Sequence, residues 1–332
     1  MSRFAKVTML GAALLLWTAP LAAQTQITPE HAKGVASGQV DPAAPAQAHG
    51  PAAEGIDIMH HISNAHEIEL PFVGAVALPH LPTIGHVPGL GAIDLSLTKH
   101  TVFLFLAAGL VALIFVLAGR AVAKAQREGR PAKGFAGTME AMALYIRQEV
   151  ILPNVGHHGE GFAPYLLTVF FFILAMNLLG LLPWGATATG NIAVTATLAL
   201  ISFVVIEVAG MRALGFKGYM STIFFLPPGL PTAMKPIMLV IMTPVEIIGK
   251  LSKPFALAVR LFANMTAGHV LVLALIGLTF IAESMSVRAG VGVLASLLAT
   301  AIMLLELFVA FLQAFVFTLL TSVFIGLMRA EH

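Results

Sequence analysis

The sequence has no cysteine among its 332 residues, which excludes disulfides, thiolate metal ligands and cysteine nucleophiles. It also lacks a glycine-rich loop of the GxxxxGKS or GxxxxGKT type, so nothing in it indicates an ATP site. The net charge is only +2, too small to indicate a polyanionic partner. We therefore expect no bound cofactor, no metal and no nucleic-acid partner.

Charged residues are scarce: they make up 10% of the chain, against 58% hydrophobic residues. A soluble domain normally has about 25% charged residues. So few polar side chains cannot cover a water-soluble protein, which predicts an integral membrane protein. Only helices and closed barrels span lipid, and the apolar runs here are continuous rather than alternating. The predicted fold class is an all-α polytopic membrane protein.

The N-terminal segment has the pattern of a secretory signal peptide. A basic start is followed by an apolar stretch and the small residues of a cleavage site, which predicts removal of residues 1–23. An uncleaved anchor helix is the alternative. Residues 24–97 are then a periplasmic tail rich in Ala, Pro, Gly and His, irregular except for a short helix over residues 57–70. Its histidines are irregularly spaced and do not predict a metal site. Residues 98–332 form the membrane domain.

Three spans are predicted first, over residues 97–119, 162–182 and 191–210. The first is followed by five basic residues against one acid, which places that loop in the cytoplasm by the positive-inside rule. The N-terminus then lies outside and the C-terminus inside, as expected in a bacterial inner membrane. Residues 135–152 are predicted to form an amphipathic helix on the cytoplasmic surface.

The last two apolar segments, residues 236–282 and 289–328, are unusually long. Forty helical residues extend about 60 Å, twice the hydrocarbon thickness of about 30 Å. Apart from Pro244 and Pro254, neither segment contains a helix breaker, and the linker between them is short. We therefore predict a steeply tilted helical hairpin, which brings the total to about five membrane helices. Such a hairpin presents a broad flank to another large membrane object.

Five polar residues interrupt this hairpin: Arg260, Asn264, His269, Glu306 and Gln313. A charge at the bilayer centre costs about 2.5–3.5 kcal/mol, so their presence needs a reason. At about 100° per residue, Arg260 and His269 point to opposite faces of one helix. We predict that His269 faces Glu306 across the hairpin and that Arg260 faces an external partner.

Structural alternatives remain for single residues. Arg260 is close enough to Pro254 to reach the membrane surface, and Asn264 and Gln313 can simply join helices by a hydrogen bond. A lone buried His269 is more often a satisfied core residue. Glu207, near the end of the third span, is interfacial or lines a channel mouth. Together, however, a histidine and a carboxyl group that both titrate near neutral pH predict a proton path. A guanidinium, which stays protonated, predicts a fixed charge that blocks a leak.

Several motifs closely resemble subunit a of F-type ATP synthases. They are RLFANMTAGH (260–269), LSKPFALAVR (251–260), ELFVAFLQAFVFTLL (306–320) and MNLLGLLP (176–183), and the resemblance covers about residues 98–330. It implies a stator subunit with no ATP site of its own. Its partners would be the c-subunit ring, the peripheral-stalk b subunits, the remaining synthase subunits and the bilayer.

The resemblance also implies residue roles. Arg260 matches the arginine that faces the c ring, and Glu246 and Ser252 fall where the cytoplasmic half-channel is placed. Positions assigned to the outward-facing half-channel are matched by Asn264, His269, Glu306 and Gln313. Some bacterial members have the histidine and the glutamate exchanged, which favours a working pair. The alternatives are a self-contained secondary transporter or ion channel, for which we find no inverted repeat, and a purely structural scaffold.

Overall fold

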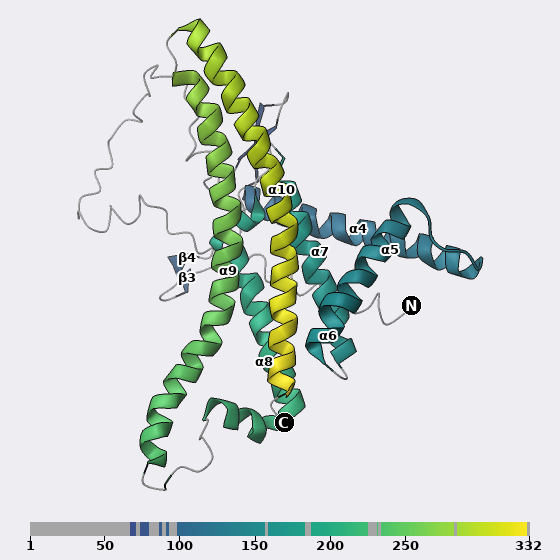
Figure 1. The fold of residues 1–332 in the computed structure, drawn as a ribbon, viewed down its shortest axis with the longest axis vertical. Helices are drawn as coiled ribbons and strands as arrows, with labels where there is room; N and C mark the ends of the chain where they lie inside the picture. Colours follow the sequence, from purple (N-terminus) through teal and green to yellow (C-terminus); the bar gives the residue numbers. More distant parts are fainter. Residues whose placement is uncertain are drawn as a thin grey trace.

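The computed structural model describes the membrane domain almost throughout, together with parts of the preceding tail (Figure 1). The described residues are 67–70, 74–79, 86–87, 91–92, 98–156, 159–182, 187–224, 231, 234–281 and 284–330. The signal peptide predicted over residues 1–23 lies outside these ranges and stays a prediction, as does most of the predicted tail.

Two short hairpins occur in the described part of the tail. Strand β1 (Glu67–Leu70) pairs antiparallel with β2 (Gly74–Ala77), and β3 (His86–Val87) pairs with β4 (Gly91–Ala92). The helix predicted over residues 57–70 is therefore wrong at its C-terminal end, where EIEL alternates charged and apolar residues as strands do. The rest of that predicted helix lies outside the described residues.

Among the described residues, five helices are long and apolar enough to cross a membrane, which confirms the predicted fold class. They are α4 (Lys99–Arg127), α7 (Ala163–Gly180), α8 (Ile192–Ile223), α9 (Lys235–Ile281) and α10 (Met285–Ala330). Helix α4 is capped by Thr98 and continues past Gly119, so Arg120, Lys124 and Arg127 extend the helix, whereas Arg130 and Lys133 lie in the predicted loop. Their lysine and arginine stems allow this because they reach water from an interfacial helix end.

Helices α9 and α10 form the predicted hairpin and pack side by side (Figure 1). They contain 47 and 46 residues, each about 70 Å long at 1.5 Å per residue. In Figure 1, α4 lies across the direction of α9 and α10 rather than along it. The five helices therefore cannot all stand perpendicular to one membrane plane. If α4 crosses upright, the hairpin is steeply tilted.

The segment predicted as one surface helix over residues 135–152 has two parts. Helix α5 (Gly134–Tyr145) contains no fully buried residue and suits a surface. It continues into the π-helical segment η1 (Ile146–Ile151) and α6 (Leu152–Val155), which contact α7 and α10. Ile146 and Ile151 are completely buried, so this half belongs to the core rather than to a surface helix.

The core lies around α7, where α4, α8 and the C-terminal half of α10 meet. Twelve of the eighteen residues of α7 are buried, because the helix is apolar all round. Phe170 of α7 packs edge to face against Phe311 of α10. Between α7 and α8, the short 3₁₀ helix η3 (Ala188–Gly190) touches α4 and α9. The hairpin packs against this core through contacts of α10 with α7 and α8 and of α9 with α8.

Candidate functional site

Two of the predicted residues meet between the long helices. The Asn264 side-chain amide donates a hydrogen bond to Oε1 of Gln313, with a donor–acceptor distance of 3.1 Å. Gln313 is completely buried, and its Nε2 atom has no hydrogen-bond partner among the described residues. This bond confirms that the two residues join α9 and α10. Both interpretations, interhelical contact and channel lining, require it.

Glu306 lies about two helical turns before Gln313 on α10, against Gly268 of α9. A Cβ atom built at Gly268 would be 2.7 Å from Cδ of Glu306, so glycine leaves the space that the carboxyl group fills. The Oε1 atom of Glu306 is buried and, within the described ranges, makes no hydrogen bond. The carboxyl group is thus placed beside the residue that precedes His269. The predicted pairing of His269 with Glu306 stays a prediction.

Arg260 lies one helical turn before Asn264 on α9. Its side chain is exposed, whereas Leu261 next to it is completely buried in the core. Many large apolar side chains on the two long helices are also exposed, among them Ile237, Val240, Ile248, Leu251, Phe255, Leu297, Leu304 and Phe308. An exposed apolar surface of this kind contacts lipid or a protein partner. The guanidinium is therefore directed away from the chain's own core.

The two residues expected nearer the start of α9 are less enclosed. Ser252 is exposed and its hydroxyl donates to the Gly249 carbonyl oxygen at 2.8 Å, while Glu246 is half-buried. Neither contacts the Asn264–Gln313 pair in any hydrogen bond or ion pair of the described residues. The structure thus joins Asn264 to Gln313 across the hairpin and leaves Arg260 and Ser252 exposed on α9.

Sequence reasoning missed a buried polar chain beneath the hairpin. The hydroxyl of Thr189 donates to Oδ1 of Asn177 at 2.9 Å, and Asn177 Nδ2 donates to the carbonyl oxygen of Ala310 at 3.2 Å. His100 Nδ1 lies 3.1 Å from the Thr187 carbonyl oxygen, which only accepts, so this nitrogen carries the proton. Asn177 could have been found in the sequence, because it is the one side-chain amide in the apolar span that forms α7. Its partners could not, because Thr189 and Ala310 belong to other segments.

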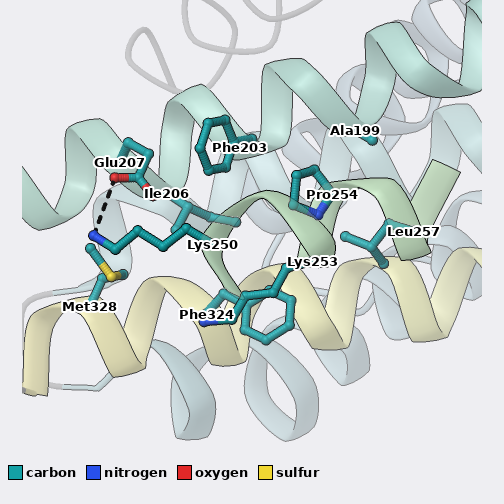
Figure 2. Close-up of a pocket in the computed structure, with 10 residues that line it drawn as sticks. All are labelled: Ala199, Phe203, Ile206, Glu207, Lys250, Lys253, Pro254, Leu257, Phe324 and Met328. Atoms are coloured by element: carbon teal, nitrogen blue, oxygen red, sulfur yellow. Dashed lines mark ion pairs between the residues drawn. The ribbon is translucent and has the colours of Figure 1, made fainter. Parts of the chain in front are cut away.

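Glu207 is paired rather than open to a channel mouth. Its carboxylate lies 3.8 Å from the Lys250 ammonium nitrogen, and both residues line a small cavity between α8, α9 and α10 (Figure 2). Lys250 does not stand out in the sequence, because a lysine close to another lysine, Lys253, is typical of a helix end at the membrane surface.

The family model described as ATP synthase A chain matches residues 101–326, about two thirds of the chain. The chain belongs to the ATP synthase A chain family. It is 45% identical over 95% of its length to "ATP synthase subunit a 2" of Chlorobium luteolum, covering 86% of that protein. It is 47% identical over 82% of its length to "ATP synthase subunit a 2" of Chlorobaculum tepidum, covering 73% of that protein. It is 45% identical over 78% of its length to "ATP synthase subunit a" of Myxococcus xanthus, covering 82% of that protein.

Family membership confirms the resemblance read from the motifs around Arg260 and Glu306. An ATP synthase A chain with five apolar helices is an integral membrane protein. The self-contained transporter is not favoured, because the relatives are named as one subunit of a larger synthase.

Proposed function

We propose that this chain is the stator subunit of the membrane sector of an F-type ATP synthase. It forms two half-channels for protons against the rotating ring of c subunits. The observation that carries the proposal is that Arg260 is exposed on α9, one helical turn before Asn264, whose side chain is hydrogen-bonded to Gln313 of α10. A permanent charge faces the partner, and groups suited to proton passage lie behind it.

Protons enter the outward half-channel past Asn264, His269, Glu306 and Gln313. Buried polar atoms normally have a hydrogen-bond partner, and Glu306 Oε1 and Gln313 Nε2 find none among the described residues. Glu306 and Gln313 are seven residues apart on α10, so a short chain of water molecules between them could hydrogen-bond to both atoms. His269 and Glu306 then pass the proton toward the ring, since imidazole and carboxyl groups can both accept and release a proton.

Protons leave through the inward half-channel, past Glu246 and Ser252. Arg260 lies between the two half-channels along α9 and attracts the ring carboxylate after its proton has gone. It cannot carry the proton itself, because a guanidinium does not deprotonate in a protein. A proton crossing the membrane yields about 2.3 kcal/mol per 100 mV, and the offset of the half-channels converts this energy into rotation.

The proposed location is a bacterial inner membrane, with the tail in the periplasm and the C-terminus in the cytoplasm. Basic residues gather at two helix ends that this orientation places inside: Lys124 and Arg127 at the end of α4, and Arg212 and Lys217 in α8. Cytoplasmic loops attract such residues.

This topology is testable because the chain has no cysteine that would interfere. We expect a cysteine at exposed Gln126, near the end of α4, to react with a membrane-impermeant maleimide only from the cytoplasmic side. A cysteine at exposed Ser284, in the hairpin bend, should react only from the periplasmic side. Labelling of both from one side would contradict the topology, because α4 and the hairpin bend are predicted to lie on opposite membrane faces.

The function itself is tested by purification of the chain from its own membranes in mild detergent. We expect it to bring with it a ring of c subunits, peripheral-stalk b subunits and a soluble ATPase, and ATP addition should drive proton uptake into reconstituted vesicles. A chain that purifies alone and conducts ions would instead be a self-contained channel or transporter. A chain that purifies alone and conducts nothing would be a structural scaffold.

A further inference from the structure

Lys250 is a buried lysine on a helix that is otherwise largely exposed. Its side chain is only 8% exposed, which is rare for lysine unless the charge is paired. All its described partners come from α8: the Glu207 carboxylate at 3.8 Å, the Thr222 hydroxyl at 3.0 Å, and the ring of Tyr219, whose centroid is 4.7 Å away. Lys250 therefore fastens α9 to α8.

These partners lie on both sides of a kink in α8. Gly215 has φ 69°, a left-handed value that glycine adopts without strain, and the chain turns there. Glu207 precedes the kink, whereas Tyr219 and Thr222 follow it, and the Tyr219 hydroxyl donates a hydrogen bond to Glu207. The cluster thus joins three pieces of helix: the two arms of α8 and the start of α9.

The same point in α9 is a weak point of the helix. Pro254 has no N–H group, so it cannot donate the usual helical hydrogen bond to the carbonyl oxygen four residues earlier, that of Lys250. Pro254 and Lys250 both line the cavity of about 10 Å³ between α8, α9 and α10, room for about one water molecule (Figure 2). Pro244 removes a hydrogen bond in the same way, so α9 can bend at either proline, but only Pro254 shares the cavity with Lys250.

We propose that Lys250 is a positioning residue that holds the proline hinge of α9 and thereby sets where Arg260 stands against its partner. The proposal rests on the stator function of Arg260. Six residues separate Arg260 from Pro254, so a change in direction at the hinge moves the guanidinium directly. Lys253 lines the same cavity but lies over the ring of Phe324 of α10, and does not join α9 to α8.

The test measures the hinge itself. Spin labels on cysteines at Ile248 and Leu271, both exposed, have Pro254 but not Pro244 between them, in a chain with no other cysteine. In the assembled complex, Lys250→Met should broaden the label-to-label distance distribution at least about twofold, because the neutral side chain releases α9 from Glu207. Lys250→Arg, which keeps the charge, should retain most of the narrow distribution. Lys217→Met is the matched control. Lys217 is an exposed lysine in the part of α8 that follows Gly215 and contains Tyr219 and Thr222, and its replacement should leave the distance distribution unchanged. A narrow distribution in Lys250→Met would overturn the proposal.

Lys250→Met leaves the Glu207 carboxylate buried without its cation, so the complex could assemble poorly for that reason alone. A second variant removes this problem. Glu207→Gln with Lys250→Met removes both charges, and we expect the same broadened distribution with the chain present in normal amount. ATP-driven proton uptake should fall about tenfold in both variants and recover in Lys250→Arg. If the distribution broadens while uptake is unchanged, the hinge does not position Arg260 and the proposal fails. If the stator function is wrong, wild-type complex shows no ATP-driven uptake, whatever the labels report.

Discussion

Replacement of Arg260 by alanine should abolish proton-driven ATP synthesis. The side chain is exposed on α9, so its loss leaves no cavity in the core and any effect reports its charge. Breaking a desolvated charge pair costs about 3 kcal/mol or more, and each 1.4 kcal/mol is about tenfold. We therefore expect a loss of about a hundredfold or more in inverted membranes supplied with a proton gradient.

The same variant should also make the membrane sector leak protons once the soluble sector is stripped away. A fixed cation between the half-channels repels a proton moving directly from one to the other, and alanine does not. Arg212→Ala is the matched control, since Arg212 is an exposed arginine of α8 that the proposal leaves out of the path. Wild-type synthesis in Arg260→Ala, or equal losses in both variants, would remove Arg260 from the mechanism.

The hairpin of α9 and α10 could be predicted because two properties of each long apolar segment specify it. The length of an apolar run and the absence of breakers are visible in the sequence, and α9 and α10 begin and end within a few residues of the predicted limits. The polar residues between them were predictable for the same reason. A charge or amide in lipid is expensive, so each one in a long apolar run demands an explanation.

Contacts between distant segments were not predictable in this way. Helical periodicity reports which side chains share a face of one helix, but not which other helix that face meets. Lys250 and Asn177 each find their partners on another element: Glu207 lies 43 positions before Lys250, and Ala310 lies 133 positions after Asn177. In the sequence alone, Lys250 is indistinguishable from the neighbouring Lys253.

Local backbone departures were also hidden. The kink at Gly215 and the π-helical turns of η1 depend on how the flanking segments pack, and both lie within runs whose composition is helical. Gly326 has a comparable role in α10. A Cβ atom there would be 3.1 Å from the Asn154 carbonyl carbon, so glycine permits close approach of α6. Gly326 thus satisfies a requirement of a distant neighbour, whereas Gly215 satisfies one of the backbone, its positive φ, and the local sequence reveals neither.

Gly268→Ala should impair proton-driven ATP synthesis although alanine favours a helix by about 1 kcal/mol over glycine. The added Cβ atom would occupy the space of the Glu306 carboxyl group, which must then move or rotate. A displacement of about 1 Å in a reacting group costs up to about a hundredfold, so we expect a loss of about ten- to a hundredfold. The rate of ATP synthesis under an imposed proton gradient measures it, normalised to the amount of chain in the membrane.

Gly277→Ala is the control, because Gly277 lies nine residues further along α9 with no atom within 4 Å of a Cβ built there. It makes the same chemical change in the same helix and should leave synthesis unchanged. Pairing Gly268→Ala with Glu306→Asp shortens the carboxylic side chain by one methylene and should restore part of the rate. Equal rates in the two glycine variants would mean that the position of the Glu306 carboxyl group does not limit proton entry. Its burial against Gly268 would then be packing alone.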